Sequence, residues 1–143
     1  MAEVPSPTVL RIAAAIIEDA EGRLLFVRKR GTSAFMQPGG KLEPGEASDA
    51  TLVRELHEEL GLEIATSSLR FVGRFAAPAA NEPGLTVDCD VYDVPLAGEP
   101  VVAAEIEELI WVDPTALPPR TTAPGALAPL SRDILVPLVL ARR

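Results

Sequence analysis

The strongest constraint on the fold is the segment 48–60, SDATLVRELHEEL, which is the clearest helix in the sequence. On a helical wheel of about 100° per residue with Glu55 at zero, Glu58 falls near −60° and Glu59 near +40°. Three carboxylates therefore share one face. The side between roughly 100° and 220° is apolar and carries Leu56, Leu60, Val53 and Ala50. The sequence predicts an amphipathic helix with an anionic polar face and a core-facing stripe.

Both ends of this helix have residues that favour a boundary. Ser48 is a candidate N-cap, because a serine hydroxyl accepts a hydrogen bond from a free backbone N–H of the first turn. Asp49 follows in that turn, where the helix dipole favours negative charge. Gly61 stands where a left-handed C-terminal cap is wanted. We therefore expect the helix to run over residues 48–60.

The remaining pattern alternates strands with turns and ends in a second helix. Strands are expected over residues 9–17, 23–30, 69–76, 85–94 and 109–112, with the first two able to form a hairpin. Residues 31–45 are expected to form a loop with a short strand near 35–37, and residues 113–129 an irregular surface excursion. A helix is expected over 130–141, kinked or shortened by Pro137. The 143 residues then form one domain, 1–143, with residues 1–7 loose.

Charge and cysteine content limit the functions open to this chain. It carries 21 acidic and 13 basic residues, a formal net charge of −8, which repels nucleic acid polymers and anionic membranes. An anionic substrate would therefore need bound cations or local basic residues. The single cysteine, Cys89, excludes an intramolecular disulfide and a cysteine-based zinc cluster. With no signal peptide and no apolar run long enough to span a bilayer, we expect a cytoplasmic monomer or homodimer.

Spacing alone leaves two interpretations of the acidic helix face. Like charges three and four residues apart each cost a few tenths of a kcal/mol. A solvated acidic surface is the commoner arrangement and is favoured by spacing alone. The alternative is a site for a hard cation, where carboxylates pool their charge to bind Mg²⁺ or Mn²⁺.

The longer segment 40–62, GKLEPGEASDATLVRELHEELGL, changes that balance. It resembles the Nudix box: a glycine, five residues, Glu, seven residues, Arg-Glu, an aliphatic residue, any residue, Glu-Glu, any residue, Gly and an aliphatic residue. All the fixed positions are filled without departure, by Gly40, Glu46, Arg54, Glu55, Leu56, Glu58, Glu59, Gly61 and Leu62. The resemblance implies an α/β fold, a Nudix-type α/β/α sandwich with a central mixed β-sheet. It also implies metal-dependent hydrolysis of a phosphoanhydride bond.

The resemblance implies roles for residues of the box. Glu58 and Glu59 are expected metal ligands, with Glu55 as ligand or base. The carbonyl of Gly39 is expected to join the shell of a Mg²⁺ or Mn²⁺ ion, beside Gly40, whose lack of a Cβ permits close approach. Arg54 is expected to orient a box carboxylate through a guanidinium fork, the alternative being an ordinary surface arginine. Glu46 precedes the helix and is expected to reach the same site.

Candidates outside the box are supported less directly. Segment 104–111, AEIEELIW, resembles the family's acidic loop, and it offers Glu105 and Glu108 as bases unless both are merely exposed. Four basic residues are candidates for substrate phosphate, the alternative for each being ordinary surface charge: Arg28, Arg30, Lys41 and Arg74. Three more residues are interpreted as packing: His57 on the apolar side of the helix, Cys89 and Trp111.

The substrate is expected to be nucleotide-like, and several classes stay open. MutT-like members that hydrolyse nucleoside triphosphates, canonical or oxidised, are similar in size, and this substrate is ranked narrowly first. Their type member recognises guanine through a late asparagine, whereas the single asparagine here is Asn81. Pro78 matches a proline of ADP-ribose pyrophosphatases, so ADP-ribose or a nucleotide sugar is the alternative. A non-catalytic Nudix module that senses a nucleotide is the hypothesis from another class. A structural interaction domain would leave the carboxylates unexplained.

Overall fold

A computed structural model describes residues 9–80, 82–116 and 126–143 of the chain. One sheet has four strands in the order β3 (Gly39–Lys41), β1 (Val9–Ile16), β5 (Thr86–Asp93) and β4 (Arg70–Pro78). Strands β1 and β5 are parallel, and the other neighbours are antiparallel. A second sheet pairs β2 (Leu24–Lys29) with β6 (Ile106–Val112). The sheet that holds β1 is therefore mixed, as predicted.

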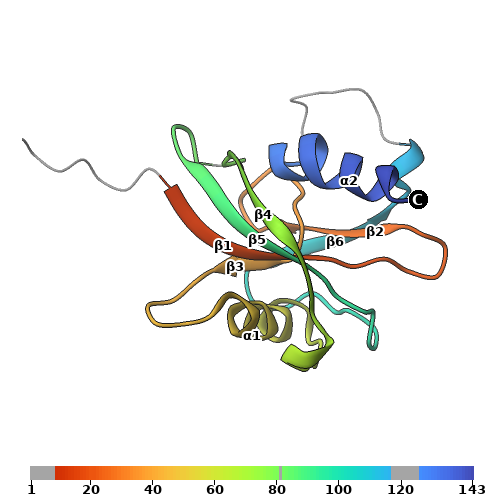
Figure 1. Ribbon diagram of the computed structural model, residues 1–143, viewed down its shortest axis with the longest axis horizontal. Coiled ribbons are helices and arrows are strands. Elements are labelled where there is room, and N and C mark those ends of the chain that lie inside the picture. The colour runs from red at the N-terminus through yellow and green to blue at the C-terminus, as the bar shows by residue number, and fades with distance from the viewer. Residues whose placement is uncertain (1–8, 81, 117–125) are drawn as a thin grey trace, which may run out of the picture.

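Helices cover the sheets on opposite sides (Figure 1). On one side lies α1 (Ser48–Leu60), and on the other a helical segment made of η3 (Leu130–Leu135) and α2 (Val136–Ala141). Strand alternation supplies both cores, because successive side chains of a strand point to opposite faces. Along β2, Leu25 and Val27 join the core beneath α1, while Leu24 and Phe26 join the core beneath η3 and α2. The predicted α/β/α sandwich is confirmed.

Helix α1 has the predicted bounds but a different N-cap and a rotated core face. The N-cap is Ala47, without a side-chain cap, and the Ser48 hydroxyl instead hydrogen-bonds Tyr92 Oη at 2.6 Å. Gly61 is left-handed, with φ 67°, as predicted. Ala50 and His57, which we expected to face the core, are exposed. The buried face is centred nearer Leu52, because the wheel locates an apolar stripe but not the element that covers it.

Three local expectations need correction. The loop expected over residues 31–45 contains β3, whose glycines pair with Ala13 and Ala14 of β1. The predicted strand near residues 35–37 is limited to isolated bridges at Phe35 and Met36. The expected hairpin of the first two strands is reduced to one bridge between Glu18 and Leu24, after which β1 and β2 enter different sheets. These pairings depend on partners distant in sequence, which local propensity does not report.

The C-terminal helix is irregular where Pro137 was expected to disturb it. Residues Leu130–Leu135 form a π-helical turn, and a regular α-helix follows over Val136–Ala141, with Pro137 in its first turn. Proline lacks an N–H and is tolerated in the first turn, where no intrahelical acceptor is required. Residues 1–7, and residues 117–125 of the predicted excursion, lie outside the described residues.

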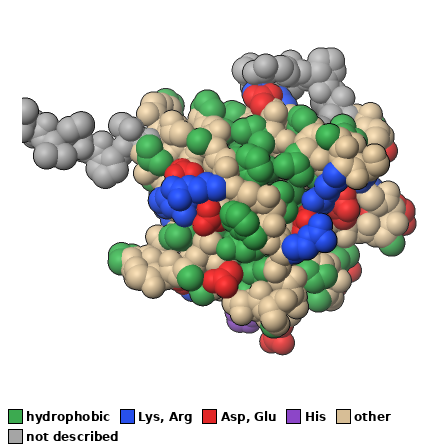
Figure 2. Space-filling view, viewed as in Figure 1, with side chains coloured by type: hydrophobic (Ala, Val, Ile, Leu, Met, Phe, Trp, Pro, Cys, Tyr) green, Lys and Arg blue, Asp and Glu red, His purple; other side chains and the backbone are tan. Residues whose placement is uncertain are grey.

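Acidic and basic side chains of the surface are largely placed beside each other. Figure 2 shows one face of the molecule, where lysine and arginine side chains gather next to aspartates and glutamates around an apolar centre. Cross-strand ion pairs such as Arg74 with Asp88 and Arg28 with Glu108 are examples of opposite charges placed side by side. Within the described residues, no helix has the length and apolar character needed to cross a membrane.

Candidate active site

Glu59, near the C-terminal end of α1, is the most buried of the helix carboxylates. The residue is 1% exposed, and its Oε1 accepts a hydrogen bond of 3.1 Å from the backbone N–H of Gly39 in β3. Its Oε2 is buried without a hydrogen-bond partner among the described residues. Burial raises the pKa of Glu59 to about 8, although the Gly39 hydrogen bond opposes the shift. The hydrogen bond from Gly39 and the charge of Lys29 therefore do not offset the cost of burying this carboxylate.

Glu55 lies one turn earlier and is pressed against the second glycine of β3. A Cβ added to Gly40 would lie 2.4 Å from the Glu55 Cδ, closer than real Cβ contacts. A Cβ on Gly39 would lie 2.0 Å from the backbone oxygen of Ala13. The Gly39–Gly40 pair is thus required by close approach on both sides. Burial also raises the pKa of Glu55, against the lowering effect of Arg54.

Arg54 binds the other carboxylates of the box. Its Nε and Nη2 donate to the two oxygens of Glu46 at 2.8 and 2.9 Å, a bidentate pair. Its Nη1 donates to Glu55 at 2.9 Å and to Glu58 at 3.4 Å. The hydrogen bonds from Arg54 and then Thr51 lower the pKa of Glu46 to about 2. Arg54 therefore holds Glu55 and Glu58 on one side of the helix, as an orienting residue would.

These side chains suit a hard cation. The unpartnered Glu59 Oε2 is a buried anionic oxygen that a cation would neutralise, and carboxylate oxygens are preferred by Mg²⁺ and Mn²⁺. In the part of the chain that the structure describes, no three acidic, histidine or cysteine side chains are grouped to share one ion. Glu55 and Glu58 instead share the Arg54 guanidinium. The Glu58 side chain is 52% exposed, so it is free to rearrange.

The acidic loop that precedes β6 is fastened to the end of α1. The N–H of Ala103 donates to the backbone carbonyl of Glu59 at 2.9 Å, and the next residue, Ala104, has a positive φ of 53°. Glu105 follows, 3.4 Å from the ammonium of Lys29. After burial, the charge of Glu105 contributes to the raised pKa of both Glu55 and Glu59. The structure therefore places Glu105 next to the helix carboxylates.

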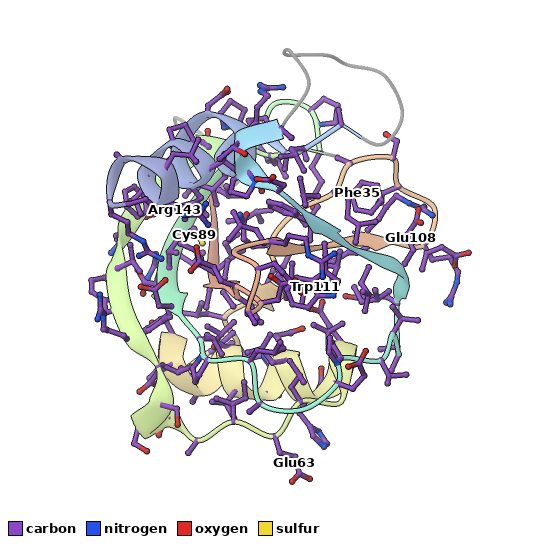
Figure 3. All side chains as sticks on the ribbon, turned by 90° about the vertical axis from the view of Figure 1, so that its right-hand side faces the viewer. Phe35, Glu63, Cys89, Glu108, Trp111 and Arg143 are labelled. Atoms are coloured by element: carbon purple, nitrogen blue, oxygen red, sulfur yellow. The ribbon has the colours of Figure 1, made fainter. Side chains whose placement is uncertain are left out.

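Glu108 is placed differently. Its Oε1 accepts a hydrogen bond of 2.8 Å from Arg28 Nε across the β2–β6 pair, and its side chain is 48% exposed. Figure 3 shows Glu108 on the side of the molecule formed by β2 and β6, with Trp111 further inside. Arg30 forms a similar exposed pair with Glu107 at 3.1 Å. Arg30 lies one residue beyond the end of β2, so the prediction that it shares a face of that strand with Arg28 is not confirmed, although each arginine pairs with a glutamate of β6.

A pocket of about 160 Å³ lies on the other side of β3 from these carboxylates. Gly39, Gly40 and Lys41 line it, so the glycine pair contacts the pocket and the acidic helix alike. Most of the remaining lining is aliphatic and comes from β1, the β4–β5 turn and the start of η3. Its polar members are Lys29, Thr32, Lys41, Glu82, Gln37 and Ser131.

Of the four basic candidates, only Lys41 lines this pocket. Arg28, Arg30 and Arg74 are not among its lining residues, and Arg74 is paired with Asp88 between β4 and β5. Lys29, which sequence reasoning missed, lies between the pocket and Glu105. Spacing carried part of the signal, because Lys29 follows Leu25 and Val27 at alternate positions of β2, but a register shift between Arg28 and Lys29 interrupts that alternation.

The remaining assignments divide between packing and exposure. Cys89 is buried and Trp111 packs against the core beneath α1, as expected. Figure 3 shows both within the molecule, whereas Glu63, just beyond α1, points away from it. His57 is exposed and contacts no member of the carboxylate group by any hydrogen bond or ion pair described for this part of the chain.

Comparison with known proteins gives a consistent result. The NUDIX domain family profile matches residues 9–134. The chain is 32% identical over 111 residues to a CTP pyrophosphohydrolase of Escherichia coli (strain K12), covering 74% of this chain and 77% of that protein. It is also 41% identical over 58 residues to an 8-oxo-dGTP diphosphatase of the same organism, which covers 37% of this chain and 44% of that protein.

Solved structures show the same fold. A MutT protein from Methanosarcina mazei Go1 superposes with a TM-score of 0.74 at 20% identity, covering 97% of this chain and 98% of that one. The Escherichia coli ORF135 protein superposes with a TM-score of 0.59 at 28% identity, covering 80% of each chain. Together with the match over residues 9–134 and the filled box on α1, these similarities show that the chain belongs to the NUDIX domain family and is a Nudix hydrolase.

Proposed function

We propose that the enzyme hydrolyses a phosphoanhydride bond of a nucleoside diphosphate derivative, and first of all a nucleoside triphosphate. One observation carries this proposal: Gly39 and Gly40 separate a pocket from the carboxylates of α1 and contact both. A nucleoside in the pocket would extend its phosphates over the glycine pair. There the absence of side chains lets a ligand approach the backbone closely.

Within the proposal, Glu55, Glu58 and Glu59 hold a divalent cation, Mg²⁺ or Mn²⁺, together with the Gly39 carbonyl. Such a cation would neutralise phosphate oxygens and lower the pKa of a bound water. Arg54 acts as a positioning residue, because its guanidinium fixes Glu46 and contacts Glu55. Lys29 and Lys41 at the pocket supply positive charge that an enzyme of net charge −8 needs for an anionic substrate.

Glu105 is the stronger candidate for the base that removes a proton from the attacking water. It lies close enough to Glu55 and Glu59 to influence the pKa of each, and its side chain is 58% exposed, so solvent water reaches it. Glu108 is bonded to Arg28 instead. The Lys29 ammonium, 3.4 Å from Glu105, keeps that carboxylate within the site.

The names of the relatives support a nucleotide substrate. The two relatives from Escherichia coli are a CTP pyrophosphohydrolase and an 8-oxo-dGTP diphosphatase, so both act on nucleoside triphosphates. A second candidate class is ADP-ribose or a nucleotide sugar, and the specific observation for it is that Pro78 lines the pocket.

The test is product release by purified protein with Mg²⁺ or Mn²⁺. The panel contains canonical and oxidised nucleoside triphosphates, ADP-ribose, nucleotide sugars and dinucleoside polyphosphates. We expect metal-dependent turnover of a nucleoside triphosphate, abolished by Glu59→Gln. Glu63→Gln is the matched control, since Glu63 is exposed and points away from the site. Turnover of ADP-ribose alone would transfer the assignment to the second class.

A non-catalytic nucleotide-sensing module makes a different prediction for the same proteins. It binds a nucleotide but turns over no member of the panel, and Glu59→Gln leaves its nucleotide affinity unchanged in the absence of metal. Calorimetry with Mn²⁺ adds a direct readout, because the proposed cation site predicts that Glu59→Gln weakens Mn²⁺ binding while Glu63→Gln does not. Equal Mn²⁺ affinity in both variants would overturn the cation site.

A further inference from the structure

Gln37 and Ser131 form a buried polar pair in the wall of the pocket. Gln37 is 7% exposed and Ser131 is 0% exposed, and both line the pocket. The Ser131 hydroxyl donates a hydrogen bond to Gln37 Oε1, although the two residues are 94 positions apart in sequence. This contact joins the loop before β3 to the first turn of η3. Buried polar groups usually have hydrogen-bond partners, so any polar atom of this pair without a partner is available to a ligand.

The glutamine amide is only half satisfied by that contact. A glutamine side chain has an acceptor oxygen and two N–H donors. The oxygen accepts from Ser131, whereas the nitrogen has no hydrogen bond among the described residues. Nor is this nitrogen fully buried, because among the described residues the one fully buried side-chain N or O atom without a hydrogen-bond partner is Glu59 Oε2. It therefore keeps contact with solvent, and Gln37 lines the pocket from which a ligand would replace that solvent.

The rest of the pocket offers few polar side chains, and among the polar lining residues Gln37 and Ser131 are the buried ones. Its surroundings are mostly aliphatic, among them Leu10, Ile12, Met36 and Leu130, and no aromatic side chain is among its lining residues in the described part. Aliphatic walls accept a base by shape but do not distinguish one hydrogen-bonding edge from another. Discrimination then falls to the polar groups in the wall.

We propose that Gln37, held by Ser131, is a specificity-determining residue that donates its amide N–H to a keto oxygen on the base of the substrate. This rests on the proposed function, since it assumes that a nucleoside occupies the pocket. Only Pro38 separates Gln37 from Gly39, so the Cα atoms of Gln37 and Gly39 are at most about 7 Å apart. That span suits a base at Gln37 and phosphates at the glycine pair.

The proposal predicts a preference for keto over amino bases. Uracil and hypoxanthine carry an acceptor oxygen at the ring edge far from the sugar, where cytosine and adenine carry an amino group. An amino group at that edge would face the N–H of Gln37. Both groups are hydrogen-bond donors, so no hydrogen bond could form between them. Leaving a buried polar group unpaired reduces binding by about tenfold or more. The enzyme should therefore prefer UTP to CTP and ITP to ATP, each pair differing at one group.

The experiment compares these two pairs in the wild-type enzyme and in three variants with Mg²⁺. Gln37→Glu replaces the donor with an acceptor of the same shape and should shift the UTP:CTP ratio of kcat/KM towards CTP by about tenfold. Ser131→Ala removes the contact that orients the amide and should bring the ratio towards one. Ser68→Ala, at an exposed serine of η1 (Thr66–Ser68), should leave the ratio unchanged.

A purely structural role for the pair would affect both substrates alike. Lower thermal stability in Gln37→Glu with the same UTP:CTP ratio as wild type would overturn the proposal, as would a wild-type preference for CTP. Where Gln37→Glu folds poorly, Gln37→Met serves as the second variant, and it should abolish the preference without reversing it.

Equilibrium binding separates this inference from the proposed function. Calorimetry with UTP and CTP is repeated in the Glu59→Gln background, with and without Gln37→Glu. A preference for UTP that Gln37→Glu reverses in this background would support base recognition, and if the protein with Glu59 intact hydrolyses neither nucleotide, the hydrolytic proposal is overturned independently. If the wild-type enzyme hydrolyses both nucleotides and the Glu59→Gln protein binds them with equal affinity, base recognition by Gln37 is overturned and the hydrolytic proposal stands.

Discussion

Arg54 donates two hydrogen bonds to the carboxylate of Glu46, from Nε at 2.8 Å and from Nη2 at 2.9 Å, and its third nitrogen, Nη1, donates to Glu55. Glu46 precedes α1 and Glu55 lies in its third turn, so one guanidinium joins the approach loop to the acidic helix face. Its three nitrogens donate to Glu46, Glu55 and, at 3.4 Å, Glu58, a geometry that a planar fork supports and an ammonium group does not.

The first prediction follows from that geometry. Arg54→Lys keeps the charge but loses the fork, and hydrogen bonds to charged groups contribute about 1.5–3 kcal/mol each. We expect kcat to fall on the order of tenfold or more while KM changes little, because the carboxylates lose their orientation rather than the pocket. Steady-state kinetics measure this, with Arg70→Lys as control, since the Arg70 side chain is 83% exposed. A kcat within twofold of wild type would contradict the orienting role.

The second prediction contrasts the two glycines of β3. Gly39→Ala places a methyl group against the backbone of β1, which has little freedom to move, so the free energy of unfolding should fall by about 1–3 kcal/mol. Gly40→Ala instead meets the Glu55 carboxylate, a side chain that can shift. Its stability should stay near wild type while kcat falls. Urea unfolding and kinetics on both variants check this, and equal loss of stability in the two would contradict it.

The third prediction concerns the pH dependence of the metal-free protein. Because the pKa of Glu59 is raised to about 8 from 4.5, the folded state binds a proton that the unfolded state has released between these values. Glu59 therefore favours folding at acidic pH and progressively opposes it as pH rises from 4.5 to 8. In EDTA, the free energy of unfolding of wild type should decline relative to Glu59→Gln over pH 5.5–8.5, by on the order of a few kcal/mol.

Cation addition should reverse that trend. The carboxylate must be ionised to bind a cation, so Mn²⁺ should stabilise the wild-type protein more at pH 8.5 than at pH 6. Glu63→Gln is again the control, and it should retain the wild-type slope in EDTA. A Glu59→Gln profile parallel to wild type would show that Glu59 ionises normally in the folded protein.

The fourth prediction separates the two candidate bases. Glu105→Gln should lower kcat by about 10²–10⁴-fold, the usual range for a general base. Glu108→Gln breaks the exposed pair with Arg28 and should change kcat by less than threefold, since exposed ion pairs contribute only about 0–1 kcal/mol. Reversed effects of the two substitutions would assign the base to Glu108.

Helix α1 was predictable because its signals are local. The apolar spacing, the acidic residues and Gly61 all lie within the segment, and the helix ends at the predicted residue with the predicted left-handed cap. Strand β3 was not predictable in the same way. Its three residues are mostly glycine, and they become a strand only because β1 pairs with them. The paired residues are distant in sequence, as Ile12 is from Lys41 and Ala14 is from Gly39.

The filled Nudix box was visible in the sequence alone, and so were the family, the α/β/α sandwich and the set of box carboxylates, because that motif depends on spacing along one helix and its approach. The burial of Glu59, the inward position of Lys29 and the contact of Gln37 with Ser131 were decided by the tertiary structure. Periodicity identifies which side chains share a face. The elements that pack against that face determine which of them loses water, which finds a partner, and therefore which pKa values and polar atoms are available for chemistry.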